Sequence, residues 1–268
     1  MTQSPSDVKR SKFDIRTFLY KLYREDFWGK KLIYQDIFRG LEQTKPYFLV
    51  FIKFLLFVYT NDGIVVGDRS NHKVTFHLCQ IFYFIGFCTF FSLSTFMFSF
   101  KKLKSLFIFF KLNFRLVLVV ILPVFCIIVN NFSFEHRFLL ADNRHYTFYI
   151  WSRIYRKFEI AKYLLTPAYL AGFYIAYKNL ENNSKTFGWL LAFVACVFAG
   201  LVPQELIEFR YFIIPYFIYR LNTGELGFKA AIFEIIFNAS INILTIYIFL
   251  NKTFSWSDSP EELQRFMW

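Results

Sequence analysis

The sequence has few cysteines, and none of them is spaced as a metal ligand or a disulfide framework would require. The four cysteines, Cys79, Cys88, Cys126 and Cys196, all lie in apolar segments and form no CxxC pair. Zinc sites and disulfide scaffolds need close or regular cysteine spacing, so this pattern argues against both. We therefore expect buried, structural thiols and no metal site.

The chain is also short of acidic residues, with 19 Asp and Glu against 31 Lys and Arg and a formal net charge of +12. Nucleic-acid-binding proteins are often this basic, but they carry a separate basic patch. Here the basic residues fall between apolar segments, as Lys101, Lys104, Lys111 and Arg115 do. That distribution follows the positive-inside rule of membrane proteins. It predicts a membrane lipid environment and no nucleic-acid partner.

Apolar and aromatic residues are abundant: 56% of the chain is hydrophobic, 40 residues are Phe, and the mean hydropathy is +0.37. A membrane-spanning helix needs about 20 mostly apolar residues. Two segments qualify outright, two more qualify with their flanks, and a shorter one is interrupted by Arg210 and Pro215, which predicts a broken or re-entrant helix. The apolar segments are 47–59, 76–100, 116–129, 160–177, 187–202, 209–219 and 230–250. We predict an all-α fold, a polytopic transmembrane helical bundle with about six or seven membrane segments.

Two regions follow from this pattern. Residues 1–46 are polar and basic with scattered apolar positions, which predicts an amphipathic segment at the membrane surface. Residues 47–268 form the multi-span transmembrane region. If the basic stretch 101–115 is a cytoplasmic loop, the alternation of segments puts three unusual polar stretches, within 61–72, 142–149 and 204–210, together on the opposite face.

The stretch around Arg144 is the richest in chemistry. Arg144 offers a planar fork suited to phosphate or carboxylate, and His145 could donate to a phosphate or move a proton. Tyr146 and Tyr149 could stack on a sugar. An equally weighted alternative is anchoring at the membrane interface, with Asp142 paired to Arg144.

Two further stretches place charges beside or inside apolar segments. Glu208 and Arg210 flank Phe209 at the start of the interrupted segment, where a broken helix could point backbone groups at a ligand; a structural ion pair is the alternative. Glu234 lies inside the last apolar segment and calls for a partner or a water-filled cavity, and the sequence leaves both open.

The third polar stretch is the weakest signal. Asp68, Arg69 and His72 combine an acid, a guanidinium and an imidazole near a glycine-permitted turn, but solvated turns often have this composition. On the following segment His77 and Gln80 are three residues apart, so they share one helix face. We expect them to make an interhelical hydrogen bond.

Several of these stretches together resemble one known family. The runs are GIVVGDRSNH at 63–72, LLADNRHYTFY at 139–149, KYLLTPAY at 162–169, VPQELIEFRYFIIPY at 202–216, LNKTFSW at 250–256 and QRFMW at 264–268. In this order and spacing they resemble the dolichyl-phosphate-glucose-dependent α-1,2-glucosyltransferases of the endoplasmic reticulum. Members add the terminal glucose to the lipid-linked oligosaccharide used for protein N-glycosylation. The resemblance implies the fold of the C-terminal half of a GT-C type membrane glycosyltransferase.

The resemblance also implies a reaction: inverting transfer from dolichyl phosphate glucose, at the lumenal face of a multi-pass membrane protein, without a metal or cofactor. The phosphate leaving group needs cationic hydrogen-bond donors, and the acceptor hydroxyl needs a carboxylate base. We assign Asp142 and Glu208 to the catalytic carboxylate positions, and expect both also to orient arginines. The remaining site residues are expected to bind substrate: Arg144, His145, Tyr146, Tyr149, Arg210, Asp68 and Arg69.

The resemblance runs from about residue 61 to 268 and matches only the C-terminal half of a usual family member. The acidic base expected from the family belongs to a first lumenal loop in the other half, which residues 1–46 do not resemble. One alternative is therefore a truncated, non-catalytic membrane scaffold or regulator. A lipid-phosphate transporter is a second, but the sequence shows no internal repeat of the kind transporters carry.

Overall fold

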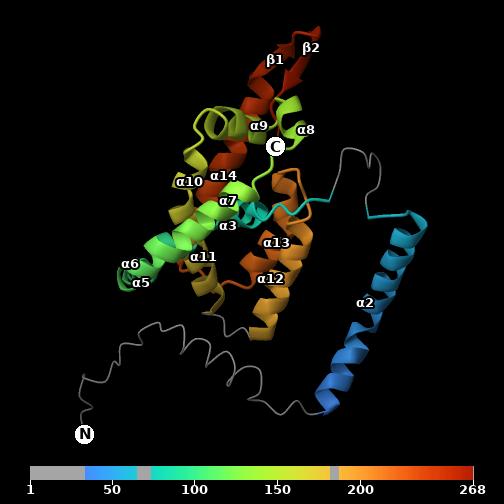
Figure 1. The fold of residues 1–268 in the computed structure, drawn as a ribbon, viewed down its shortest axis with the longest axis vertical. Coiled ribbons are helices and arrows are strands. Elements are labelled where there is room, and N and C mark those ends of the chain that lie inside the picture. The colour runs from blue at the N-terminus through green and yellow to red at the C-terminus, as the bar shows by residue number, and fades with distance from the viewer. Residues whose placement is uncertain (1–33, 65–73, 182–186, 268) are drawn as a thin grey trace. The chain divides into compact units, whose positions relative to one another are not determined.

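The computed structural model describes residues 34–64, 74–181 and 187–267 (Figure 1). The chain forms two compact units. The first unit comprises residues 1–72 and 186–192, and the second comprises residues 73–185 and 193–268. The described part of the first unit contains helix α2, Tyr34–Thr60, which continues through Pro46. The sequence had placed a boundary between two segments at this proline. The helix ends in a turn at Asp62 and Gly63, both with positive φ.

The apolar stretch 76–100 was predicted to form one spanning helix, and this prediction is wrong. It forms α3 (Cys79–Phe91), α4 (Ser94–Met97) and the start of α5 (Phe100–Leu112). The Ser92 hydroxyl bonds to the Cys88 carbonyl at the end of α3, and Ser99 caps α5 by accepting from Lys102 N. Serine side chains compete with the helical backbone in this way. The basic stretch expected to be a loop is thus largely helical.

Two of the described helices are long and apolar enough to cross a membrane. One is the continuous run 114–131, built from α6 (Phe114–Leu116), the π-helical turn η2 (Val117–Ile121) and α7 (Leu122–Asn131). The wider turn ends two residues before Pro123, which cannot donate a backbone hydrogen bond within an α-helix. The other is α14 (Phe228–Asn251). Helix α3 and the Gly188–Leu201 stretch are apolar but shorter, so the expected six or seven membrane segments stay a prediction.

The remaining apolar segments fold close to their expected positions. They form α10 (Ala161–Leu164), α11 (Thr166–Glu181), α12 (Phe187–Leu201) and α13 (Phe209–Leu221). The prediction of a break in α13 is wrong, because the helix continues through Pro215. Phe212 of α13 is buried against Phe84 and Phe87 of α3, and this packing offsets the hydrogen bond that the proline removes.

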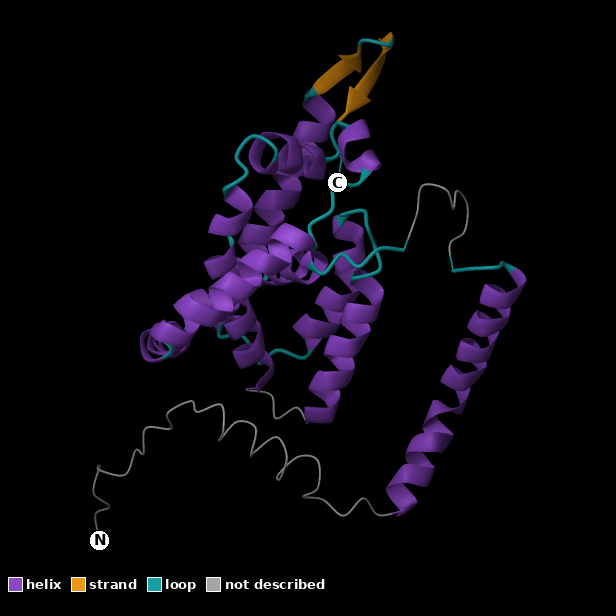
Figure 2. Ribbon diagram, viewed as in Figure 1, coloured by secondary structure: helices purple, strands orange, loops and turns teal. Residues whose placement is uncertain are grey.

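The fold is mostly helical rather than all-α, since the C-terminal residues form a β-hairpin (Figure 2). Strands β1 (Thr253–Trp256) and β2 (Ser259–Arg265) pair antiparallel, with a register shift between Ser255 and Trp256. The short helices α8 (Arg137–Ala141) and α9 (Tyr146–Ile150) and the π-helical turn η3 (Trp151–Tyr155) complete the described elements.

The helices of the second unit pack around α3. A core cluster joins Cys79 and Phe82 of α3 to Val129 of α7 and Tyr169 of α11. A second cluster joins Leu139, Trp151 and Ile207. Cys79 and Cys88 are buried thiols as expected, whereas Cys126 is only half-buried and Cys196 is exposed. The prediction of four buried thiols is therefore right for two of them and wrong for Cys196.

Candidate functional site

The loop that precedes α13 is held by two buried side chains at the start of α3. His77 Nδ1 lies 3.0 Å from the Glu205 carbonyl, and the His77 amide donates to the Val202 carbonyl at 2.9 Å. Gln80 Nε2 donates to the carbonyls of Gln204 and Leu206, both at 3.0 Å. The expected interhelical bond is thus wrong in its partner: these residues fix a loop backbone, and with it the start of α13.

The Asp142 carboxylate binds Arg144 through its side chain and its backbone. Arg144 Nε donates to both carboxylate oxygens at 2.9 and 3.1 Å, Nη2 donates at 2.7 Å, and the Arg144 amide donates at 3.0 Å. These hydrogen bonds from Arg144 hold the pKa of the Asp142 carboxyl below its ordinary value. A carboxylate stabilised in this way is a weak proton acceptor and a good anchor for the guanidinium.

Arg144 keeps part of its donor capacity. Among the described residues, its Nη1 group donates to no protein acceptor, and about a third of its side chain is exposed. His145 lies beside it, with Nε2 at 3.6 Å from an Asp142 oxygen. The loop therefore presents a positioned guanidinium edge, which is the geometry that recognises phosphate and carboxylate oxygens.

The second charged motif is at the start of α13. Glu208 precedes the helix in an extended conformation, and its carboxylate forms an ion pair with Arg210. The Glu208 side chain is 22% exposed and that of Arg210 is 71% exposed. The Arg210 guanidinium also lies 5.7 Å from the centre of the Tyr211 ring. The pair leaves Arg210 accessible to a ligand outside the protein.

An apolar pocket of about 550 Å³ borders both motifs. Tyr146, Thr147 and Tyr149 line it from α9, and Ile207 and Phe209 line it on either side of Glu208. Most of the remaining wall is aromatic and comes from α3 and η3: Tyr83, Phe87, Phe90, Phe91, Trp151 and Tyr155. Two of the three polar stretches therefore meet at one pocket. The third, with Asp68 and Arg69, lies outside the described residues.

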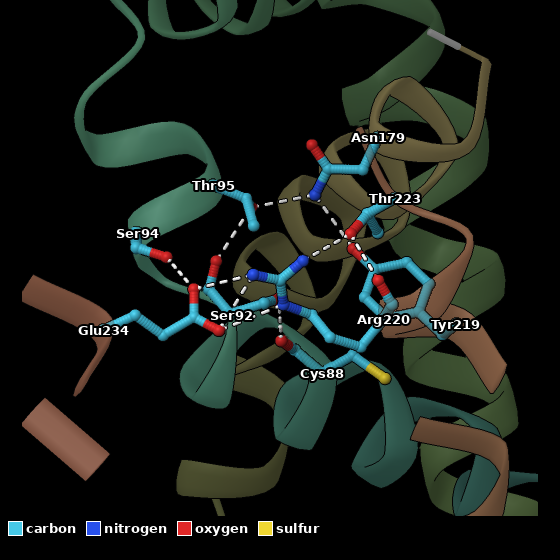
Figure 3. A network of polar contacts seen from close by, with 9 residues as sticks. All are labelled: Cys88, Ser92, Ser94, Thr95, Asn179, Tyr219, Arg220, Thr223 and Glu234. Carbon is cyan, nitrogen blue, oxygen red and sulfur yellow. Dashed lines mark hydrogen bonds and ion pairs between the residues drawn. The ribbon is translucent and has the colours of Figure 1, made fainter. Parts of the chain in front are cut away.

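Glu234, whose partner the sequence left open, contacts neighbouring helices (Figure 3). Arg220 of α13 donates to its two oxygens from Nε and Nη2, both at 3.0 Å, and the Ser94 hydroxyl also bonds to it. The third arginine nitrogen, Nη1, donates to the Thr223 hydroxyl at 2.7 Å.

The same interior region contains Asn179, which donates to Thr95 and Tyr219 and accepts from Lys102. The hydrogen bonds of these residues join α4, α5, α11, α13 and α14 within the protein. Sequence reasoning missed Arg220 because it stands at the end of an apolar segment and resembles a flanking charge.

The tail was singled out only by its resemblance, and the structure gives it contacts with the Arg144 loop. Trp256 Nε1 donates to Asn143 Oδ1 at 2.7 Å, and the Arg144 guanidinium carbon lies 5.1 Å from the Trp256 ring centre. No spacing in the sequence predicts this contact, because the two segments are more than 100 residues apart.

Comparison with known proteins adds a family and several relatives. Residues 2–221 match the DIE2/ALG10 family. A Rattus norvegicus protein named Dol-P-Glc:Glc(2)Man(9)GlcNAc(2)-PP-Dol alpha-1,2-glucosyltransferase is 46% identical over 225 residues, covering 84% of this chain and 46% of the rat protein. A Homo sapiens protein of the same name is 45% identical over 88% of this chain and 50% of its own length. One from Drosophila melanogaster is 35% identical over 96% and 56%.

The chain thus spans about half the length of the relatives it matches. The family match begins at residue 2, so the expectation that similarity begins near residue 61 is wrong. No solved structure matches the chain.

Proposed function

Because the chain belongs to the DIE2/ALG10 family, we propose that it forms the donor-phosphate side of a dolichyl-phosphate-glucose-dependent α-1,2-glucosyltransferase. The relatives' shared name identifies the donor and the diglucosylated lipid-linked acceptor of those proteins. For this chain we propose the same reaction, in the endoplasmic reticulum membrane, with a multi-pass topology and a site facing the lumen. Its apolar helices agree with a membrane protein.

One observation carries the proposal: an almost wholly apolar pocket is bordered by the two arginine-bearing motifs. Tyr146 and Tyr149, which line it, follow Arg144 by two and five residues, and Phe209 lies between Glu208 and Arg210. Dolichyl phosphate glucose has the matching division into an apolar isoprenoid, an anionic phosphate and a sugar. Apolar walls suit the first, and guanidinium groups suit the second.

In the proposed reaction the acceptor's 2-hydroxyl oxygen attacks the anomeric carbon as the bond from that carbon to the phosphate oxygen breaks. The bonding electrons leave with dolichyl phosphate, and the hydroxyl proton goes to a base. Arg144, Arg210 and His145 stabilise the charge that develops on the phosphate. Tyr146 and Tyr149 line the sugar path, whereas Asp68 and Arg69, expected from the resemblance to bind substrate, lie outside the described residues.

The two motif carboxylates orient these cations. Asp142 holds Arg144 through bonds to its side chain and amide, and Glu208 pairs with Arg210. The Asp142 carboxylate, whose pKa is lowered by the hydrogen bonds from Arg144, is a weak base for the proton of the acceptor hydroxyl, and Glu208 is already engaged by Arg210. We therefore infer that a further carboxylate acts as the base, and we rank Asp142 as the alternative.

The competing proposal is a non-catalytic scaffold or regulator. It is favoured by the same two ion pairs, since both motif carboxylates are already engaged by arginines. A scaffold would keep this arrangement for stability and transfer no glucose.

Glucose transfer to the diglucosylated lipid-linked oligosaccharide separates these proposals. Membranes that lack the host enzyme would express the chain alone, or the chain together with the N-terminal half of a relative. Activity of either preparation that is lost in Arg144→Lys but kept in Lys252→Ala supports the donor-site assignment. Confirmed expression without transfer in both preparations supports the scaffold.

A further inference from the structure

The C-terminal hairpin and the residues after it pair with the backbone of the Arg144 loop. The Met267 amide donates to the Arg144 carbonyl at 2.9 Å, and the Tyr146 amide donates to the Met267 carbonyl at 3.3 Å. His145 and Met267 are the partners of this isolated parallel bridge. The bridge spans His145, so both neighbours of this residue are tied to the tail. Backbone pairing of this kind fixes the path of a loop rather than a single side chain.

Trp256 adds a side-chain contact to the same loop. Its indole N–H donates to Asn143 Oδ1 at 2.7 Å, and its ring lies against Arg144 with 5.1 Å between the guanidinium carbon and the ring centre. Trp256 stands where the hairpin register shifts, pairing with Ser259. Such irregularities re-aim a side chain out of the regular strand alternation.

A third contact connects the hairpin to the apolar pocket. Phe254 of β1 packs on Phe266, with ring centres 5.0 Å apart, and Phe266 packs on Tyr149 at 5.6 Å. Tyr149 lines the pocket. The tail therefore contacts the loop at its charged end and at its aromatic end.

We propose that Trp256 is a positioning residue for Arg144, and that the tail 253–267 holds the loop in its ligand-binding geometry. This rests on the proposed role of Arg144 at the donor phosphate. Asp142 accepts from Nε and Nη2 of the guanidinium and the Trp256 ring lies against the group, so Nη1 is the nitrogen left to present to a ligand. A guanidinium held in this way loses less freedom when it binds an anion, which raises affinity and rate.

The first test needs no ligand. An arginine-specific dicarbonyl reagent is applied to the purified full chain, and mass spectrometry follows the peptide that contains Arg144. We expect Trp256→Leu to raise the modification rate of Arg144 about threefold, since the lost ring contact is worth about 0.5–1 kcal/mol. Leu263→Ala, an exposed position on the same hairpin, is the matched control and should change nothing. An unchanged rate in Trp256→Leu overturns the proposal.

The second test measures binding of dolichyl phosphate in detergent. Trp256→Phe keeps a ring and loses the bond to Asn143, so Kd should rise about fivefold, as expected for one neutral hydrogen bond. Trp256→Leu should weaken binding about tenfold or more, and Leu263→Ala should not. Asn143→Ala should match Trp256→Phe, and the double variant should be no worse than either, because all three break one bond.

The outcomes separate the two proposals. A raised Arg144 reactivity with an unaltered Kd, at an unchanged Tm, overturns the positioning role of Trp256. If the chain without any substitution binds no dolichyl phosphate, the donor-site proposal itself is overturned. Weaker binding in Trp256→Leu with partial rescue by Phe supports positioning, because a merely structural role would lower Tm together with affinity.

Discussion

The Asp142–Arg144 pair and the Arg220–Glu234 pair each join a guanidinium to a carboxylate by two nitrogens, yet their surroundings differ. Arg220 uses all three nitrogens on protein acceptors, and Glu234 also binds Ser94. Within the described residues Arg144 directs Nη1 at no acceptor. Glu234 is near the start of α14, whereas the hairpin that touches Arg144 follows the end of α14. The Arg220–Glu234 pair, near the start of α14, is therefore closed, because the protein uses all three guanidinium nitrogens. The Asp142–Arg144 pair, near the end of α14, is open, because one nitrogen is left for a ligand.

The largest expected effect comes from breaking the closed pair. Arg220→Met leaves the partly buried Glu234 carboxylate without its cation, which should cost about 3 kcal/mol of unfolding free energy, the lower end of the range for a buried pair. Denaturant unfolding of the detergent-solubilised chain measures this. Glu225→Gln, an exposed position on the neighbouring loop, serves as control and should change stability by less than about 0.5 kcal/mol. A similarly small change in Arg220→Met would mean that the Arg220–Glu234 pair does not stabilise the fold.

Breaking the open pair should act on activity rather than on stability. Arg144→Lys keeps the positive charge but loses the planar fork. We expect glucose transfer to fall about 100-fold, as when one oriented donor to a developing charge is removed, with Tm nearly unchanged. Lys252→Ala is the basic control outside the pocket lining. If Tm falls enough to account for the lost glucose transfer, Arg144 stabilises the fold, as Arg220 does, and does not bind the donor.

The sequence predicted elements well where apolar residues run without interruption. Helices α12 and α14 begin and end within two residues of the expected segments. The prediction of one helix over residues 76–100 failed because Ser92 and Ser99 bond to nearby backbone groups and divide the stretch. Hydropathy averages over such local competition and cannot detect it.

The same contrast holds for the site. The Asp142–Arg144 pairing was predicted because the two residues are neighbours in the chain. The Trp256 contact and the Arg220–Glu234 bond join separate elements, and only the packing of α14 against its neighbours brings them together. Local motifs are readable from the sequence, whereas the partners that hold them in place are set by tertiary structure.

A third change tests the packing of α11 against α3, which supports both the pocket and the polar network. Gly172 of α11 faces α3, and an added Cβ would lie 2.7 Å from both Ile85 Cγ2 and Thr89 Oγ1. Helix α11 also carries Tyr169 of the pocket and Asn179 of the network. Gly172→Ala should therefore destabilise the fold by about 1–3 kcal/mol through overpacking. Gly200→Ala meets no atom within 4 Å and should be neutral or slightly stabilising; equal effects of the two would rule out close α3–α11 packing.

The smallest expected effect is the pH dependence of the open pair. Hydrogen bonds from Arg144 lower the pKa of Asp142 in the folded chain, so the folded carboxyl binds its proton less readily than the unfolded one. The stabilisation is therefore fully present above the ordinary pKa of about 3.9 and is lost as the pH falls through the lower, folded value. Because the pair is partly exposed, it should contribute about 0.5–1 kcal/mol to the free energy of unfolding.

Denaturant unfolding of the unsubstituted chain and of Asp142→Asn at several pH values measures this contribution. The difference in unfolding free energy between the two chains should be constant from pH 5 to 8 and should disappear in strong acid. A difference that persists in acid would mean that Asp142 acts through packing. No difference at neutral pH would mean that the tail alone positions Arg144.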